Sequence, residues 1–591
     1  DKYNNKIKNP YYSLSNQKYQ KEKFTFITSV NASVFITKWL KLKGKYTLEK
    51  LNSNTNRFTP IGYITSDTTQ SLGYLYKNDI SSTYQTAQAT ANINHSFGDF
   101  LVKSKLSYMY ENKTYNTFST SSNELMISGI EQFGNAASGS ITSYSYDYQI
   151  VSANYFAIAD IDYKSKYLFS GLFRRDGSSL FGENVRWNNY FRVAGAYRIS
   201  EDFEIPGIQE LKIRTAYGTS GLRPGFSYQY ETYSYNSLGL QKLQLGNLNL
   251  KPSEARELEF ALDAQFLNVF NFTASFSNTN TYDAFVNIPL PAIMGFTSQW
   301  DNAATINSTS LEFSLGVIAL DKNDSRISFQ INFDKITQEI TYLKYNSFYS
   351  GPASAYYITA GEPFGVLYGY DWVSSLDVMA EQLPTGKTID DYIVNSDGYV
   401  IENGTEGSRL EKAIMLDNNN DGTPDKVLIG DGNPNFHLGF SSNIKVKNFT
   451  LYFLFDWKNG GDVYNYTKQG LFFENRAAEV DQFGKAEDEK KYTGYYTEFY
   501  HNGDINSYFI EDGSYLKLRE VSLFYSTSLK NSLSFVKTLR IGVVANNLLT
   551  FTKYTGYDPE VAYSGDLTTF AFDWNGYPHY RTISASIQLK F

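Results

Sequence analysis

The stretch Arg581-Thr-Ile-Ser-Ala-Ser-Ile-Gln-Leu-Lys-Phe591 decides the fold class of this chain, because its apolar and polar side chains alternate without a break. The apolar set is Ile583, Ala585, Ile587, Leu589 and Phe591, and the polar set is Thr582, Ser584, Ser586, Gln588 and Lys590. A β-strand places alternate residues on opposite faces, so this segment has one apolar and one polar face. Because chain ends usually fray, an apolar face that runs to the final residue favours a strand with a lipid-facing side.

The composition agrees with a barrel that is polar inside and apolar outside. Of the 591 residues, 42% are hydrophobic and only 19% are charged, and 50 are Tyr and 43 are Phe. Tyrosine favours membrane–water interfaces. No run of ~18 apolar residues exists, so no transmembrane helix is expected, although a barrel hides its signal in alternation. The net charge of −8 argues against nucleic-acid binding, and the absence of Cys excludes disulfides and thiolate metal sites.

Alternating segments and their connections extend this pattern along the chain. The segments 257–264, 270–276, 327–334 and 449–457 alternate in the same way. Connections are alternately short and long. The short ones are 36–39, 97–99, 163–166, 266–268, 321–325 and 446–448, and the long ones are approximately 52–81, 113–147, 219–252, 278–303, 336–433, 459–513 and 550–580. This asymmetry is typical of an outer-membrane barrel. The alternative, a soluble β protein, does not need such long loops at every second connection.

We therefore predict an all-β chain that forms a transmembrane antiparallel β-barrel. About 17 strands are expected, the first near 21–35 and the last ending at Phe591, whereas bacterial single-chain barrels use even numbers. The prediction is thus one domain, 1–591, that is a barrel incomplete at its N-terminal side, with a long extracellular loop at 336–433.

Several ordered segments carry a family resemblance. They are Asn9-Pro-Tyr-Tyr12, Arg175-Asp-Gly-Ser-Ser179, Leu211-Lys-Ile-Arg214, Gly246-Asn247, Leu250-Lys-Pro-Ser-Glu254, Gly430-Asp-Gly-Asn-Pro-Asn-Phe436, Asp512-Gly-Ser-Tyr-Leu-Lys-Leu-Arg519, Ala545-Asn-Asn-Leu548, Tyr557-Asp-Pro-Glu560 and Gly576-Tyr-Pro-His-Tyr-Arg-Thr582. Together they resemble the SusC/RagA-like family of TonB-dependent outer-membrane transporters of Bacteroidota. The resemblance implies a barrel of about 22 strands, a plug, a TonB box and a SusD-like lid lipoprotein. No segment here resembles the plug, and Phe591 looks like the signal that the barrel assembly machinery reads.

Three functions stay open from the sequence. The leading one is TonB-dependent import of a large nutrient, either a glycan or a peptide, with TonB acting through the plug and outer-membrane lipid surrounding the barrel. The second is a SusC-like barrel that serves as a structural scaffold in an assembly or secretion complex. The third is a barrel enzyme, which we do not expect, because the four histidines (His95, His437, His501 and His579) lack metal-ligand spacing and no catalytic residue stands out.

One local motif offers oxygen ligands for a cation. Asp417, Asn419 and Asp421 stand at alternate positions before Gly422, and Asp425 follows. This is the first half of an EF-hand-like loop, so Ca²⁺ is a candidate cofactor. The alternative is an Asx-rich turn without metal, since Asn, Asp and Gly favour turns by themselves.

Tyrosines in the long connections are candidates for ligand or lid contact, because aromatic faces stack on sugar rings and hold peptides at low entropic cost. The alternative is that these rings pack on each other. The candidates are Tyr228, Tyr230, Tyr233, Tyr349, Tyr356, Tyr495 and Tyr496.

Overall fold

The computed structural model describes residues 10–64, 69–236, 239–487, 489–500, 504–529, 535–560 and 570–591. It divides into two compact units. The first unit is Asp1–Gly195, Gly218–Ser253 and Asn287–Asp301, and the second is Ala196–Tyr217, Glu254–Val286 and Asn302–Phe591. Asn9 of one family motif and His501 lie outside the described residues.

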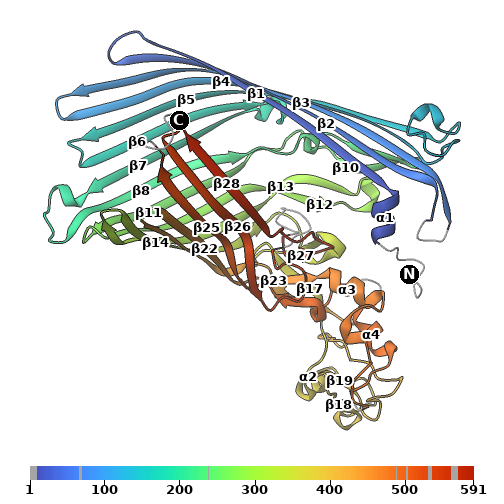
Figure 1. Ribbon diagram of the computed structural model, residues 1–591. Helices are drawn as coiled ribbons and strands as arrows, with labels where there is room; N and C mark the ends of the chain where they lie inside the picture. The colour runs from blue at the N-terminus through green and yellow to red at the C-terminus, as the bar shows by residue number, and fades with distance from the viewer. Residues whose placement is uncertain are drawn as a thin grey trace. The chain divides into compact units, whose positions relative to one another are not determined.

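Strands dominate the described chain (Figure 1). The longer ones are β1 (Lys18–Phe35), β2 (Leu40–Ile64), β3 (Gln70–Phe97), β4 (Phe100–Ser122), β5 (Ile141–Tyr163), β6 (Tyr167–Ser178), β7 (Trp187–Arg198), β8 (Ile208–Leu222), β11 (Ser253–Phe266), β12 (Phe270–Pro289), β13 (Ser298–Lys322), β14 (Ser325–Leu343), β21 (Pro434–Val446), β22 (Phe449–Gly460), β25 (Tyr515–Ser528), β26 (Thr538–Thr552) and β28 (Thr582–Lys590).

Shorter elements lie mostly in the long connections. The short strands are β9 (Thr232–Asn236), β10 (Gly239–Leu245), β15 (Phe348–Ser350), β16 (Tyr356–Ile358), β17 (Val366–Tyr370), β18 (Tyr392–Val394), β19 (Val400–Glu402), β20 (Lys426–Asp431), β23 (Asp462–Asn465), β24 (Ile510–Asp512) and β27 (Phe572–Asp573). The α-helices are α1 (Pro10–Asn16), α2 (Leu376–Glu381), α3 (Tyr466–Phe473) and α4 (Thr493–Tyr500). Among the described residues, no helix combines the length and the apolar character needed to cross a membrane.

In the first unit, strands β1 to β6 form a meander in which each strand pairs antiparallel with the next. Direct cross-strand partners share a face of the sheet. One row of partners is apolar and consists of Val34, Leu42, Ala91, Leu106, Ala157 and Phe173. The adjacent row, on the opposite face, consists of Ser33, Lys43, Thr90, Ser107, Phe156 and Arg174.

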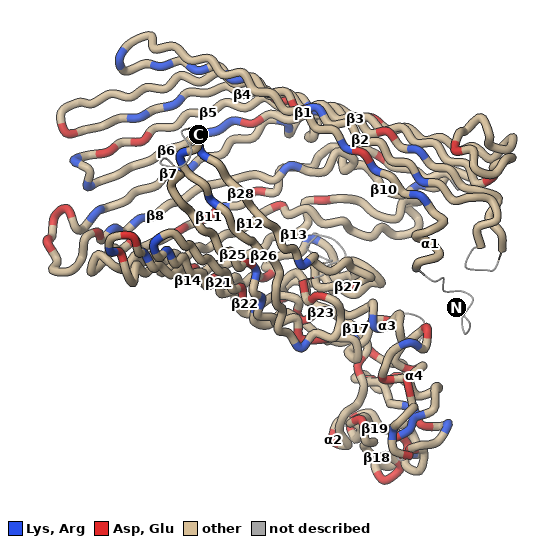
Figure 2. Tube along the Cα trace, in the orientation of Figure 1, with Lys and Arg blue, Asp and Glu red and all other residues tan. Residues whose placement is uncertain are grey.

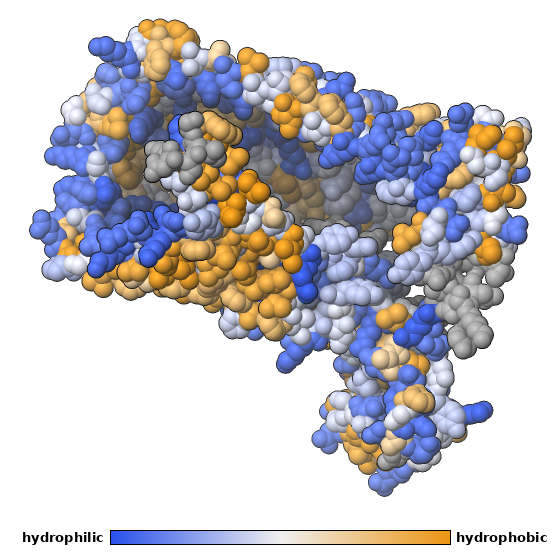
Figure 3. Space-filling model, in the orientation of Figure 1, coloured by the Kyte–Doolittle hydropathy of each residue, from blue (hydrophilic) through white to orange (hydrophobic). Residues whose placement is uncertain are grey.

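The second unit repeats this arrangement in β13, β14, β21, β22, β25, β26 and β28. Its apolar row is Leu320, Ile327, Ile444, Leu451, Leu523, Val543 and Ala585. On the opposite face, β14 to β28 align Ser328, Asn443, Tyr452, Ser522, Val544 and Ser584. The apolar face is open to the surroundings, since Leu523 is 50% exposed and Ile583 is 70% exposed. Figure 3 shows hydrophobic surface over β22, β25 and β26. The predicted alternation, one apolar and one mainly polar face, is confirmed.

The short turns lie where the sequence predicted them, and their backbone explains why they are tight. In the turn 163–166, Lys164 and Ser165 have φ of 55° and 58°, and Leu267 and Asn268 have φ of 56° and 54°. Left-handed backbone at both central positions is the geometry of a type I′ turn, whose twist matches that of the flanking strands. In both hairpins only three residues separate the paired strand residues, Tyr163 from Tyr167 and Phe266 from Phe270.

The long connections predicted at 219–252, 459–513 and 550–580 lie as expected between β8 and β11, β22 and β25, and β26 and β28. Those predicted at 52–81 and 113–147 begin later than predicted, and for these two the prediction is wrong. β2 and β3 stay paired from Leu40 opposite Ile93 to Ile64 opposite Gln70, so most of the predicted loop 52–81 is strand. β4 and β5 are likewise paired up to Ser122 opposite Ile141. In these outer parts of the strands, backbone hydrogen bonds continue beyond the end of the apolar face. The alternation of apolar and polar residues, on which the sequence interpretation depended, is therefore absent.

The predicted loop 336–433 also contains structure of its own. β14 continues to Leu343, and a small sheet of β15, β16, β17 and β20 and a β18–β19 hairpin follow before β21 pairs with β14. Together with 459–513 and β27, this region has a hydrophobic cluster, which we call the loop core. It consists of Ala355, Tyr356, Leu367, Trp372, Ala413, Tyr464, Phe472, Ala477, Tyr495, Tyr496, Phe499, Ile505, Phe509 and Phe572. The connection therefore resembles a small folded domain inserted between two neighbouring strands.

Candidate functional site

A charged cluster lies on the polar face of the second unit. Asp456 of β22 and Lys517 of β25 are direct cross-strand partners. In the β22–β25 register, the consecutive residues Leu454 and Phe455 pair with Glu520 and Leu518, so Arg519 is one extra residue, which is the geometry of a β-bulge. A bulge re-aims the extra side chain, and here it brings Arg519 to Asp456. We call Asp456, Lys517, Arg519 and the acids that they bind the charged cluster.

Lys517 is almost fully buried and is neutralised by two acids. Only 2% of its side chain is exposed. Its Nζ donates to Oδ1 of Asp558 at 2.6 Å and also contacts Glu560. A buried ammonium persists only where it is paired, so these two carboxylates, from the connection between β26 and β28, are required to hold Lys517 in place.

Arg519 binds two carboxylates at once. Its Nη1 donates to Glu560 at 2.6 Å, and its Nε donates to Asp456 at 2.9 Å. The planar guanidinium suits this, because its donors are arranged in a fixed fork that matches carboxylate geometry. Arg519 therefore joins β22, β25 and the β26–β28 connection.

Glu560 is the centre of the cluster. Burial opposes ionisation of its carboxyl group, but hydrogen bonds from Arg519 and Lys517 outweigh burial and lower its pKa to about 2. Glu560 is therefore a carboxylate at neutral pH, and it fastens the β26–β28 connection to the polar face of β25.

Three of the segments that carried the family resemblance meet in this cluster. Lys517 and Arg519 belong to the first of them, Asp558 and Glu560 to the second, and His579 of the third has its Nε2 4.0 Å from Glu560. We did not predict this cluster as a site. The only hint in the sequence was that two motifs about forty residues apart carry opposite charges (560 − 519 = 41). The sequence alone does not show that these motifs are in contact.

The same acids do not fit a metal site. Among the described residues, Asp558, Glu560 and His579 are the only group of three His, Cys, Asp or Glu side chains whose ligand atoms lie within 4.8 Å of one another. However, Lys517 and Arg519 occupy the carboxylate oxygens that a cation would need. We assign no metal to this cluster.

The predicted calcium loop forms a network of Asx turns. Asp417 accepts the backbone N–H of Gly422 at 2.9 Å, and Asn419 accepts that of Asp421 at 2.9 Å. Asp425 accepts two successive backbone N–H groups at 2.9 and 3.2 Å. These contacts agree with the turn interpretation, while Ca²⁺ binding stays a prediction.

Three of the candidate tyrosines belong to the loop core rather than to its surface. Tyr356, Tyr495 and Tyr496 are 0%, 2% and 6% exposed. Tyr495 packs against Phe499 with ring centroids 5.4 Å apart. Burial raises the pKa of the Tyr495 phenol, whose oxygen accepts a hydrogen bond from Asn395. In this conformation these rings cannot touch a ligand, so the packing alternative holds for them.

The other candidate tyrosines keep accessible surface. Tyr230, Tyr233 and Tyr349 are each about two-fifths exposed. Tyr228 is stacked on Trp300, with ring centroids 4.0 Å apart and planes 7° apart. These four remain candidates for ligand or lid contact.

Residues 2–399 match the family described as TonB dependent receptor-like, beta-barrel. The chain belongs to this family of outer-membrane proteins. The family is one of transporters and receptors rather than enzymes.

Relatives of this TonB-dependent receptor barrel support the same assignment. The chain is 25% identical to TonB-dependent receptor P3 of Formosa agariphila over 99% of its own length and 60% of that protein. It is 24% identical to TonB-dependent receptor SusC of Bacteroides thetaiotaomicron over 76% of this chain and 44% of that protein. The chain thus spans less than two thirds of the length of these relatives.

Solved structures support the fold. The barrel matches the RagAB peptide importer in its open-open state with a TM-score of 0.77, at 20% identity, over 98% of this chain and 62% of that one. The SusC/RagA resemblance is therefore confirmed. The final residue, Phe591, is 65% exposed, and its main-chain oxygen accepts a hydrogen bond from Lys537 Nζ at 3.0 Å. Its role as a barrel-assembly signal stays a prediction.

Proposed function

We propose that the chain forms the wall and the extracellular loops of a TonB-dependent importer for a nutrient too large for porins. The observation that carries the proposal is the pair of faces described above, in a member of this family. An apolar row faces lipid across neighbouring strands, and the row beside it lines an aqueous interior. The wall supplies an enclosure and binding loops, and no bond-making group.

The substrate class that we propose is a glycan or a peptide. RagAB is described as a peptide importer, which supports the peptide option. The accessible rings of Tyr228, Tyr230, Tyr233 and Tyr349 suit either class, because aromatic faces stack on sugar rings and also pack against peptide side chains.

The proposal includes the other parts that the family resemblance implies. These are a barrel of about 22 strands, a plug on which TonB acts, and a SusD-like lipoprotein that closes over the loops. A wide barrel needs a plug because its lumen would otherwise leak. The folded connection 344–433 and the loop core offer the lid a rigid surface. Figure 2 shows acidic and basic residues side by side around α3, α4, β18 and β19, as expected for a water-exposed surface.

Uptake by the source bacterium tests this function. Deleting the gene should abolish growth on one class of polymer, and the full-length gene should restore it. A copy in which the TonB box is deleted should fail to restore growth while reaching the outer membrane at the same level. If that copy restores growth, import is not TonB-dependent. If deletion leaves uptake of both glycans and peptides unchanged but disrupts a surface assembly, the scaffold alternative replaces import.

A further inference from the structure

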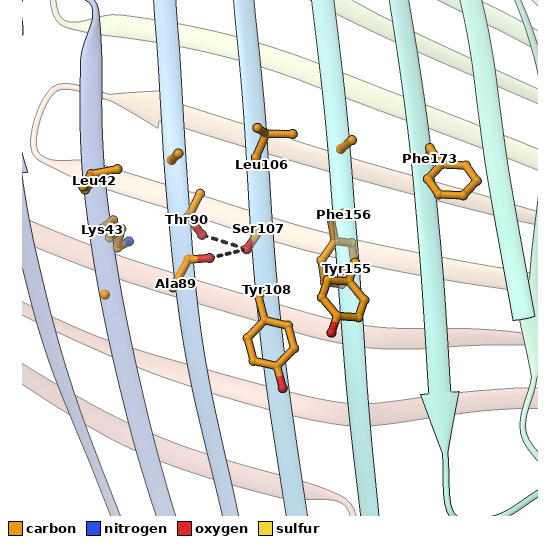
Figure 4. Close-up of a pocket in the computed structure, with 13 residues that line it drawn as sticks. Leu42, Lys43, Ala89, Thr90, Leu106, Ser107, Tyr108, Tyr155, Phe156 and Phe173 are labelled. Atoms are coloured by element: carbon orange, nitrogen blue, oxygen red, sulfur yellow. Dashed lines mark hydrogen bonds between the residues drawn. The ribbon is translucent and has the colours of Figure 1, made fainter. Parts of the chain in front are cut away.

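A groove of about 700 Å³ crosses the apolar face of the first unit (Figure 4). Its size is in the range of small-molecule sites. The small side chains at its floor are Gly44, Ala89, Ala91 and Ala157, and the large ones at its sides are Leu42, Leu106, Tyr108, Tyr155 and Phe173.

Strand register accounts for the depression. Gly44 is the direct partner of Ala89, and Leu42 is the partner of Ala91 two positions along the same strands. Three small residues therefore adjoin on β2 and β3, beside the bulky Leu106 and Tyr108 of β4. A Cβ atom added at Gly44 would meet no heavy atom within 4 Å, so the space above the glycine is open.

Hydrogen bonds on the opposite face hold the floor in shape. The hydroxyls of Thr90 and Ser107 are 2.8 Å apart, Ser107 Oγ donates to the carbonyl of Ala89 at 3.1 Å, and Gln88 donates to Ser107 at 3.0 Å. These contacts tie β3 to β4 directly beneath the groove. The groove is therefore preformed, which lowers the cost of binding.

The groove ends near the edge of the membrane's apolar band that lies farther from the short turns. Tyr108 lies eight residues beyond Phe100, where the short turn ends (108 − 100 = 8). At ~3.3 Å per residue and a tilt of ~45°, it lies roughly 19 Å above that turn, near the far edge of an apolar band ~25 Å tall. Beyond it, on the same face, Gln149 donates a hydrogen bond to Asn112 at 2.9 Å. The apolar lining thus ends where polar pairs begin.

Two tyrosines mark this boundary. Tyr108 and Tyr155 are cross-strand partners with ring centroids 5.1 Å apart. In Figure 4 both hydroxyls are directed toward the end at which the ribbon of Phe173 (β6) terminates, which is the long-connection side. Interfacial tyrosines place their hydroxyls at headgroup level, and long connections of bacterial barrels are extracellular. The groove therefore opens toward the outer leaflet.

We propose that the groove binds one acyl chain of an outer-leaflet lipid, with Tyr108 and Tyr155 at the level of its headgroup. The occupant is lipid because the groove lies in the hydrocarbon band of an outer-membrane protein and has apolar residues at its sides and floor. The apolar row described for the second unit has larger side chains, since it carries Ile444, Leu451, Leu523 and Val543 at consecutive strands. Lipid there stays bulk solvent, whereas lipid in the groove is held.

Photocrosslinking of the full-length protein tests this site. The protein is placed in phosphatidylethanolamine–phosphatidylglycerol nanodiscs that contain phosphatidylethanolamine with a diazirine in its acyl chain. Peptides that contain Leu106 or Ala157 should be labelled about fivefold more, per exposed apolar residue, than peptides of β22 and β26, which corresponds to a modest preference in affinity. The variants Gly44→Leu and Ala157→Leu should remove this excess.

Gly171→Leu is the matched control. Gly171 lies on the same face of β6, pairs with Ala159, and also has no heavy atom within 4 Å of an added Cβ, but it does not line the groove. This variant should keep the excess labelling, and heat-modifiable gel migration verifies that every variant forms a barrel. Equal labelling of both units, or equal loss in the control, would overturn the proposal. Crosslinking to a second protein chain at Leu106 would overturn it too. Excess labelling of a full-length protein that supports no uptake would count against the import function alone.

Discussion

The long strands, which form the barrel wall, and the loop core both use large apolar residues, but in opposite surroundings. Leu523 of the wall is 50% exposed, whereas Phe499 of the loop core is fully buried. The wall leaves its apolar side chains for lipid to cover, while the loop core covers its own, as a water-soluble domain does. One chain therefore folds against two solvents, and a mutation should act through whichever solvent its residue meets.

The largest expected effect is truncation in the loop core. Phe499 packs against Tyr508 and Trp372 with ring centroids 4.2 and 4.9 Å apart. Phe499→Ala should destabilise the loop core by about 3–5 kcal/mol, because it leaves a cavity. Limited proteolysis should then cut within 344–513 while heat-modifiable migration of the barrel is kept. Leu523→Ala, which removes an exposed wall residue, should leave proteolysis unchanged, and the reverse outcome would contradict the comparison.

A buried ion pair beside the loop core should matter nearly as much. Lys491 Nζ contacts Glu411 at 2.5 Å, and their side chains are 2% and 1% exposed. Lys491→Met should cost about 3–5 kcal/mol, since it removes the countercharge of the buried Glu411, which keeps only hydrogen bonds from Asn395 and Gly407. The exposed pair Lys387–Glu402 is the control, and Lys387→Met should change the denaturation of the loop region little. Similar losses in both variants would show that burial does not govern these pairs.

A charge introduced on the apolar face of a strand tests whether that face contacts lipid. Ala585→Lys places an ammonium on the apolar face of β28 and should destabilise the barrel by about 2–4 kcal/mol, if it lies near the bilayer centre. Ser584→Lys adds the same charge one residue away on the polar face and should cost far less. Urea unfolding in lipid vesicles measures both. Equal destabilisation would mean that the face of Ala585 does not meet lipid.

Acid should release the charged cluster without unfolding the wall. The pKa of Glu560 is lowered to about 2, so its carboxylate contributes stability above the ordinary pKa near 4.5 and loses it as pH falls toward 2. Cleavage by pepsin between β26 and β28 should therefore increase over that interval. Glu560→Gln should be cleaved more readily at pH 4.5 and respond less to further acid. A wild-type response confined to pH above 5 would exclude Glu560 as its cause.

The smallest expected effect concerns the Asx-rich loop. If Asp417, Asn419, Asp421 and Asp425 bind Ca²⁺, millimolar Ca²⁺ should protect the connection 344–433 from protease, and Asp425→Asn should remove the protection. If they form only turns, chelation will change nothing.

The wall was predictable from the sequence, because its two faces meet different solvents and so leave a period of two, and because its turns are short. Strand ends were not, since the strands stay paired around Thr55 and Asn78, where polar residues occupy both faces and the period of two is lost. Tyr495 and Tyr496 looked like ligand contacts because a connecting segment was not expected to build a core. The partners Lys517 and Glu560 are separated by a strand and a turn, and only the fold brings them together.

The charged cluster sets a rule for exchanging parts among relatives. Asp558 and Glu560 come from one connection, while Lys517, Arg519 and Asp456 come from two strands. A chimera with a foreign β26–β28 connection that lacks these acids would leave Lys517 buried without its two carboxylates and Arg519 with Asp456 as its remaining acid. The β26–β28 connection should therefore be exchanged together with Asp456, Lys517 and Arg519. Any loop exchange that aims at a new substrate should transfer all five charged residues at once.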